Sequence, residues 1–181
     1  AAERGTIDLI EDFAAAIPVQ LIGDMLGIPQ DERGPLRGWS LKILGALETV
    51  LSKQQFDGGV TAVAEFKDYL GDLVARRQRE GTDDKAEILS TLIAGSEIIL
   101  GHGSDNSLSE LELLHNCIFL LNAGHETTTN LIGNSVDLLI RHPDAMRELA
   151  AHPELIETAV EEFLRMESSN QLGNRRAATA A

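Results

Sequence analysis

An acid and an alcohol stand side by side in the middle of a long apolar helix pattern. Residues 121–133 read Leu-Asn-Ala-Gly-His-Glu-Thr-Thr-Thr-Asn-Leu-Ile-Gly, with Glu126 and Thr127 at the centre. Apolar residues at helical spacing precede and follow this run, at Leu111, Leu114, Ile118, Leu121, Leu131, Leu138 and Leu139. Burying an unpaired polar group costs about 1–3 kcal/mol. A chain that accepts this cost uses the groups for chemistry or satisfies them in a polar cavity.

The limits of this helix can be predicted from its flanking residues. Ser109 and Glu112 have the spacing of a capping box, and no residue breaks the pattern before Pro143. The helix is therefore expected to have about 33 residues and a length of about 50 Å, enough to cross a domain. Gly124 weakens it by about 1 kcal/mol relative to Ala. The missing side chain beside Glu126 also lets a small ligand approach the backbone.

The rest of the chain predicts a mainly α fold with little or no sheet, in a single domain over residues 1–181. Helices are expected at 7–15, 18–27, 31–49, 60–79, 86–94, 143–151 and 153–166, with a turn at 81–84, a loop at 97–106 and a strand or disordered tail from residue 173. The helix at 60–79 carries an apolar stripe at Val63, Phe66, Leu70, Leu73 and Val74.

Composition limits the classes of partner. The net charge of −14 disfavours binding to nucleic acid and to anionic membranes. No apolar run approaches the roughly 20 residues of a membrane span, and residues 1–20 lack a basic start. The one cysteine excludes an internal disulfide and suits a reducing compartment. These features predict a cytoplasmic protein.

Two motifs carry a family resemblance. Ala-Gly-His-Glu-Thr-Thr at 123–128 resembles the oxygen-binding segment of the central I helix of bacterial, soluble cytochromes P-450. Glu161-Glu-Phe-Leu-Arg165 resembles the Glu-x-x-Arg motif of the family's K helix, with Glu162 and Arg165 as the pair. Segments at 7–14 and 17–29 and Trp39-Ser40 resemble the stretch that leads to the F helix. The resemblance covers essentially the whole chain.

The resemblance implies a P-450-like helical core around the I helix, and a haem-thiolate monooxygenase that inserts one oxygen atom into a small organic substrate. It implies haem b and a ferredoxin or flavoprotein electron donor. By resemblance, Glu126 and Thr127 deliver protons to dioxygen at the haem.

Further site residues follow by the same resemblance. Ala123, Gly124 and Thr127 would face the haem, and Arg176 best matches an arginine that binds a haem propionate. Glu162 and Arg165 would form a buried structural pair rather than a catalytic one. Substrate contacts in the family come from segments that match 36–51 and 120–123.

The family ligates the haem iron through a cysteine in a Phe-Gly-x-Gly-x-x-x-Cys-x-Gly loop, which has no match before Ala181. Cys117 lies instead on the I-helix pattern. The resemblance therefore implies a central fragment without the N-terminal and C-terminal haem-binding parts. Such a chain is expected to be inactive by itself and to bind haem weakly or not at all. Its uncovered haem face would favour self-association.

Other interpretations remain open at this point. A zinc site at His125 and Glu126 lacks the second histidine, since Thr129 stands at that position, and His102, His115, His142 and His152 are scattered. The Gly101–Gly103 stretch lacks the lysine and strand of a phosphate loop. The chain is alternatively a non-catalytic helical binding module, the remnant of a truncated gene, or one part of an ordinary full-length enzyme. The reading frame on both sides would separate these cases.

Overall fold

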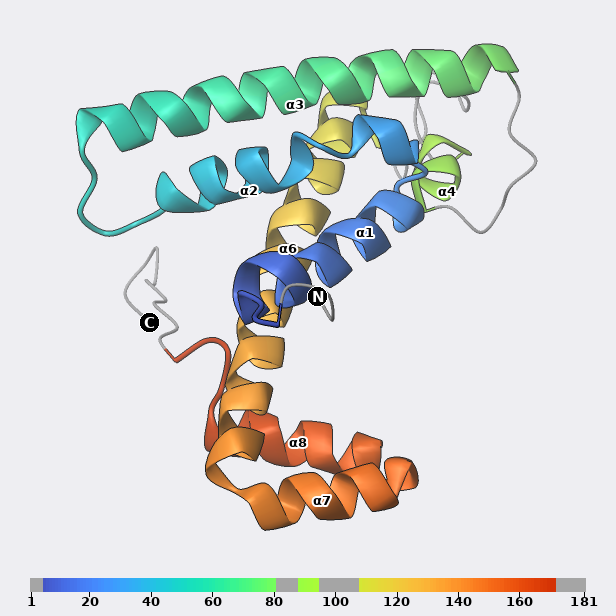
Figure 1. Ribbon diagram of the computed structural model, residues 1–181. Coiled ribbons are helices and arrows are strands. Elements are labelled where there is room, and N and C mark those ends of the chain that lie inside the picture. The colour runs from blue at the N-terminus through green and yellow to red at the C-terminus, as the bar shows by residue number, and fades with distance from the viewer. Residues whose placement is uncertain (1–4, 81–87, 95–107, 172–181) are drawn as a thin grey trace, which may run out of the picture. The chain divides into compact units, whose positions relative to one another are not determined.

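The protein is mainly helical, as predicted. A computed structural model describes residues 5–80, 88–94 and 108–171, and the described residues contain no strand. The elements, shown in Figure 1, are a π-helix η1 (Ile10–Ala14), α1 (Ala16–Met25), a 3-10 turn η2 (Gln30–Glu32), α2 (Leu36–Gly45), α3 (Lys53–Glu80), α4 (Ile88–Ala94), α6 (Glu110–Arg141), α7 (Pro143–Ala151), a 3-10 turn η3 (Pro153–Leu155) and α8 (Ile156–Met166).

The chain divides into two compact units. One comprises Ala15–Glu126, and the other comprises Ala1–Ala14 with Thr127–Ala181, so α6 contributes to both. The prediction of one domain over residues 1–181 stays a prediction. The turn at 81–84, the loop at 97–106 and the tail from residue 173 lie outside the described residues.

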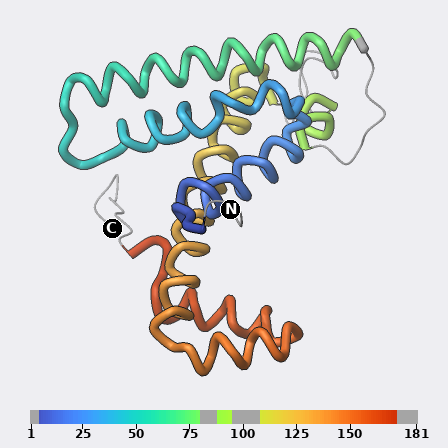
Figure 2. The backbone as a smooth tube through the Cα atoms, viewed as in Figure 1, coloured from blue at the N-terminus to red at the C-terminus, as the bar shows by residue number. Residues whose placement is uncertain are grey.

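The core of the larger unit is built from apolar side chains of α1, α2, α3, α4 and α6, with α2 packed against α3. The two helices run antiparallel, as Figure 2 shows, and Trp39 stacks on Phe66 with ring centroids 5.0 Å apart. The indole Nε1 of Trp39 donates to Glu65 Oε2 at 2.9 Å. Phe66 and Leu70 are fully buried, which confirms the apolar stripe expected on α3.

The end of α1 is set by a glycine. Gly27 has φ of 62°, and the amide of Ile28 donates to the carbonyl of Gly23 at 2.8 Å. This is the Schellman pattern, in which a left-handed residue closes the helix. The second helix was expected to begin at residue 18, but α1 begins at Ala16, and Pro18 lies inside its first turn, where its missing N–H costs nothing.

Two of the predicted helices had wrong boundaries. The helix expected over 31–49 begins only at Leu36, after Pro35, and ends at Gly45, which leaves Leu47 exposed. In contrast, α3 begins at Lys53 rather than Val60, because packing against α2 carries the helix through Gly58 and Gly59.

The long helix is confirmed. The amide of Ser109 donates to Glu112 Oε2 at 2.9 Å, and the amide of Glu112 donates to Ser109 Oγ at 3.3 Å. This reciprocal pair is the expected capping box. The observed helix has 32 residues. Among the described residues, no helix is long and apolar enough to cross a membrane.

The smaller unit contains α7, η3 and α8 after the last turns of α6. His142 and His152 occupy the N-cap positions before Pro143 and Pro153, although neither side chain caps its helix. Asn134 Nδ2 donates to the carbonyl of Glu167 at 3.3 Å and ties α6 to the end of α8. Neither α7 nor α8 contributes a buried residue.

Candidate functional site

Ala123 and Thr127 lie on one exposed face of α6. Residues four apart in a helix share a face, and the structure exposes both of these together with Glu126 and Asn130. Phe119, one turn before Ala123 on the same face, is 67% exposed. Ala123 and Thr127, two of the residues expected to meet the cofactor, thus lie in an open stripe that also contains Phe119, Glu126 and Asn130.

Gly124 points elsewhere. A Cβ built on Gly124 would lie 2.9 Å from Cδ1 of Ile22 in α1. The space beside Gly124, where a small ligand was expected to approach the backbone, is therefore filled by the Ile22 side chain. Gly124 allows α1 to approach α6, which is a packing role away from the exposed stripe.

His125 is buried against α2. Its side chain is 2% exposed, and Nδ1 lies 3.0 Å from the hydroxyl of Ser40, which is fully buried. Burial and, to a lesser extent, the nearby charge of Arg37 lower the pKa of His125. From the sequence, His125 was considered for a zinc site, and its place in the core was not predicted. Its spacing from Ile118 and Leu121, both buried, was the signal that it belongs to the packed face.

Asn122 is a second polar residue on the packed side of α6. Its Nδ2 donates to the carbonyl of Ile118 at 2.7 Å. Its Oδ1 is buried and accepts no hydrogen bond from any described residue. An internal water is the usual partner of such an oxygen.

Glu162 and Arg165 form the expected ion pair on α8, but they are not buried. The guanidinium makes two hydrogen bonds, Nε to Oε2 at 2.7 Å and Nη2 to Oε1 at 2.6 Å. The side chains of Arg165 and Glu162 are 68% and 50% exposed. The expectation of burial was wrong for this chain because no described residue covers this face of α8. The pair lowers the pKa of Glu162 and raises that of Arg165.

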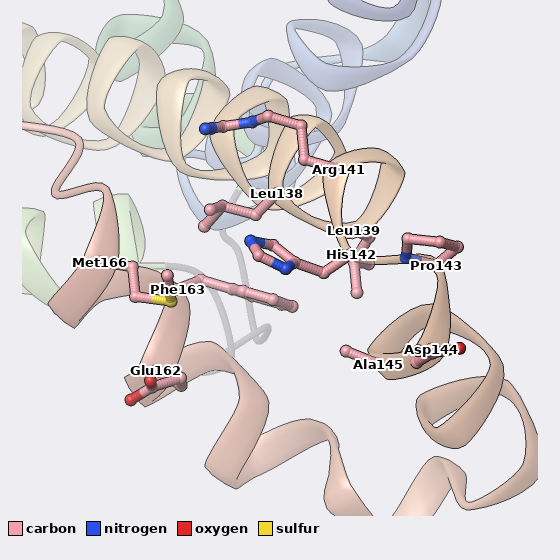
Figure 3. A pocket seen from close by; sticks show the side chains of 10 residues that line it. All are labelled: Leu138, Leu139, Arg141, His142, Pro143, Asp144, Ala145, Glu162, Phe163 and Met166. Carbon is pink, nitrogen blue, oxygen red and sulfur yellow. The ribbon is translucent and has the colours of Figure 1, made fainter.

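A pocket of about 540 Å³ lies in the smaller unit, where α6, α7 and α8 meet. Figure 3 shows Leu138, His142 and Phe163 pointing into it, with Glu162 at its edge. Neither Glu126 nor Thr127 lines this pocket, so it is separate from the exposed stripe.

Cys117 does not have the properties of a metal ligand. Its side chain is fully buried among apolar residues, and burial raises its pKa to about 12. It therefore stays a thiol at neutral pH. No group of three His, Cys, Asp or Glu side chains that could hold a metal ion occurs in the part of the chain that the structure describes. Arg176 lies outside the described residues.

Comparison with known proteins matches this chain to one family. The family model described as Cytochrome P-450 matches residues 42–172. The chain is 39% identical over 164 residues to the vitamin D(3) 25-hydroxylase of Pseudonocardia autotrophica, covering 91% of this chain and 37% of that enzyme. It is 34% identical over 169 residues to the biotin biosynthesis cytochrome P-450 of Bacillus subtilis, covering 93% of this chain and 40% of that protein.

Solved structures agree. The crystal structure of P450BioI with an acyl carrier protein ligated to hexadec-9Z-enoic acid superposes with a TM-score of 0.76 and 33% identity, covering 89% of this chain and 39% of that one. The crystal structure of CalO2 gives a TM-score of 0.77 at 30% identity, covering 91% and 39%. The chain thus spans about two fifths of the length of these relatives. It belongs to the cytochrome P-450 family, and α6 is its I helix.

Proposed function

We propose that this chain supplies the oxygen-activating I helix of a bacterial haem-thiolate monooxygenase. The observation that carries the proposal is the exposed stripe of α6, which places Ala123 and Thr127 on one face with Glu126 beside them. We further propose that residues 1–181 belong to one catalytic domain in the whole protein, which we place in the cytoplasm.

The side chains of this stripe fit a flat apolar cofactor. Ala123 is small enough for a planar ring to approach the helix, and Phe119 adds apolar surface one turn earlier. Haem, when bound, supplies the binding and reductive activation of dioxygen. By family resemblance Arg176 would hold a propionate. Gly124 is not needed for this face, since it contacts Ile22.

Thr127 and Glu126 are suited to proton transfer. A threonine hydroxyl is one donor and two acceptors of hydrogen bonds, so Thr127 can accept a hydrogen bond from one water molecule and hold it in place for proton transfer. Glu126 is exposed next to it and can exchange its own proton with solvent. Together they can act as a general acid through water, and such groups contribute typically 10²–10⁴-fold to a rate.

The axial thiolate must come from outside these 181 residues, because Cys117 is buried within α6 as a neutral thiol. We therefore propose that the chain by itself does not oxygenate substrate and binds haem weakly or not at all. Its exposed stripe would instead favour self-association. In the whole protein, the substrate is a small organic molecule, and a ferredoxin or flavoprotein supplies electrons.

Two measurements test the proposal. The 181-residue chain, mixed with haem and reduced under carbon monoxide, should show no thiolate-type absorption band. A band that disappears in Cys117→Ala would overturn the role given to this residue. The absence of a band is also expected for the alternative, a non-catalytic helical module. A second measurement is therefore needed to distinguish the two.

The second measurement uses the protein expressed from its full reading frame. Thr127→Ala should lower the oxygenated product formed per electron consumed, because protons then reach dioxygen without control. The control Thr128→Ala removes a threonine hydroxyl one position further along the helix. It should leave the ratio of product to electrons near that of the parent. No thiolate band in the full-length protein would favour the non-catalytic module.

A further inference from the structure

A buried polar contact between two side chains joins α2 to α6 within a largely apolar core. His125 Nδ1 and Ser40 Oγ lie 3.0 Å apart, with exposed fractions of 2% and 0%. Around them the core consists of apolar side chains such as Ile43, Leu121 and Ile118. Burial alone does not explain why polar side chains occupy these two positions, because apolar side chains could fill the same volume.

The pair stands next to the residues proposed to act on dioxygen. His125 directly precedes Glu126 and Thr127, and successive residues of a helix are turned by a fixed angle of about 100°. Any contact that fixes the direction of His125 toward α2 therefore fixes the directions of Glu126 and Thr127 as well.

The contact between α1 and this part of α6 is apolar and weakly directional. Ile22 of α1 lies against Gly124, where neither partner has a polar group. Hydrophobic contact is non-directional, so it holds the helices together without selecting one rotation. A buried hydrogen bond does select one, since it is lost when donor and acceptor turn apart.

We propose that Ser40 and His125 are a positioning pair that fixes the rotation of α6 and so holds Glu126 and Thr127 on the exposed face. The inference rests on the proposed function for its biological meaning. The sequence of α2 matches a substrate-contacting segment of the family. The Ser40–His125 contact would connect this segment directly to the turn of α6 that carries Glu126 and Thr127.

The charged groups around His125 favour its neutral form. Arg37, one turn before Ser40 on α2, opposes protonation of the imidazole. On α6 the adjacent Glu126 is exposed. On α1, the Asp24 carboxylate is already paired with Arg33. A neutral imidazole has one donor and one acceptor nitrogen, so it can bond the Ser40 hydroxyl in either direction.

The test uses the 181-residue chain without haem. Nitrogen-15 NMR reports the tautomer and titration of each of its five histidines, and His125→Gln identifies the signal of His125. Amide hydrogen exchange is followed along α6. Ser40→Ala should change the tautomer balance of His125 and speed exchange around Glu126 and Thr127 by about five- to tenfold, the effect of one ordinary hydrogen bond. Amides at Leu113–Ile118 should not change.

Matched variants separate positioning from general loss of stability. Ser135→Ala removes a hydroxyl that bonds the Leu131 carbonyl of its own helix, and it should not affect the Glu126 turn. His125→Leu removes the hydrogen-bonding side chain and should lose protection of the α6 amides from exchange. His125→Gln keeps a hydrogen-bonding side chain and should retain most of this protection. If His125→Leu does not fold, Ser40→Ala alone still decides the question.

An unchanged His125 signal in Ser40→Ala would overturn the pair itself. Equal acceleration along the whole of α6 would overturn the positioning role. Neither outcome involves haem, thiolate or turnover, so a failure here is distinct from a failure of the proposed function, which the carbon monoxide spectrum and the electron-to-product ratio test.

Discussion

Gly59 and Ala46 touch where α3 crosses α2. A Cβ built on Gly59 would lie 2.2 Å from the Cβ of Ala46 and 3.2 Å from the carbonyl oxygen of Lys42. The first distance is far below van der Waals contact. The absence of a side chain at Gly59 thus sets how closely these two helices approach.

Gly59→Ala is expected to destabilise the protein by about 1–3 kcal/mol, the usual cost of overpacking a core contact. Gly58→Ala is the matched control, because nothing lies within 4 Å of a Cβ at Gly58. The control should be stabilising by about 1 kcal/mol, the helix preference of Ala over Gly. Urea denaturation measures both, and effects of the same sign would contradict the close approach.

A second glycine, Gly23, leaves room for the side chain of Arg33. Its side chain is 7% exposed, and a Cβ on Gly23 would lie 2.6 Å from its Nε. The guanidinium donates to the carbonyls of Ile28 at 2.8 Å and Gln20 at 3.1 Å, and to the Asp24 carboxylate at 2.8 Å. It thereby satisfies backbone acceptors at the end of α1.

Arg33→Lys should destabilise the protein by about 1–3 kcal/mol, because one ammonium group cannot reach this set of acceptors and at least one buried carbonyl loses its donor. Arg79→Lys is the control, since Arg79 is exposed and, among the described residues, its side chain bonds the Ala75 carbonyl of its own helix. Thermal denaturation of both variants measures the difference. Equal shifts would show that the Arg33 contacts contribute nothing specific.

Glu32 links the segment before α2 to α3. Arg76 makes two hydrogen bonds of 2.7 Å to its carboxylate, and the Tyr69 hydroxyl donates at 2.6 Å. The hydrogen bonds from Arg76, then from Tyr69, lower the pKa of Glu32 from 4.5 to about 2. The folded protein therefore binds this proton less readily than the unfolded chain does.

Because the folded pKa of Glu32 is lowered, its contribution to stability is complete above pH 4.5 and is lost as the pH falls toward 2. Arg76→Gln should lower the free energy of unfolding at neutral pH, and its deficit relative to the parent should shrink through this window. Urea titrations at several pH values measure the deficit. A deficit independent of pH would mean that Glu32 does not provide it.

His125 should give a separate pH dependence. Its pKa is lowered from 6.5 in the folded protein, first by burial and then by Arg37. The unfolded chain therefore takes up a proton first, and stability should fall as the pH drops below 6.5. His125→Gln should flatten this part of the profile, whereas His115→Gln, at an exposed position of the same helix, should leave it unchanged.

The sequence predicted the parts of the fold that follow from local chemistry. Ser109 and Glu112 mark the start of α6 through their own hydrogen bonds, and Pro143 marks the helix that follows. The ends of α2 and α3 were misplaced because tertiary contact decided them: Gly59 breaks a helix pattern in isolation but fits α2 in the folded protein.

The candidate site also has a part that could be predicted from the sequence and a part that could not. Ala123 and Thr127 follow from motif and helix period alone. The partners of Gly124 and His125, which are Ile22 and Ser40, come from helices far away in sequence, so no local pattern reveals them. The burial of Glu162 and Arg165 was inferred from a family environment that the described residues do not provide around α8.

This exposure changes what Glu162 should contribute. In the 181-residue chain, Glu162→Ala and Glu161→Ala should both leave the urea midpoint close to that of the parent, because exposed ion pairs are screened by solvent. The lowered pKa of Glu162 means that any contribution it makes exists above pH 4.5 and disappears below it. Added salt should reduce it further.

A clear loss of stability in Glu162→Ala alone, at neutral pH and insensitive to salt, would show that the Glu162–Arg165 pair is covered in solution. Self-association of the chain is then the first explanation to test, by repeating the denaturation at several protein concentrations. A midpoint that rises with concentration would identify a second copy as the cover.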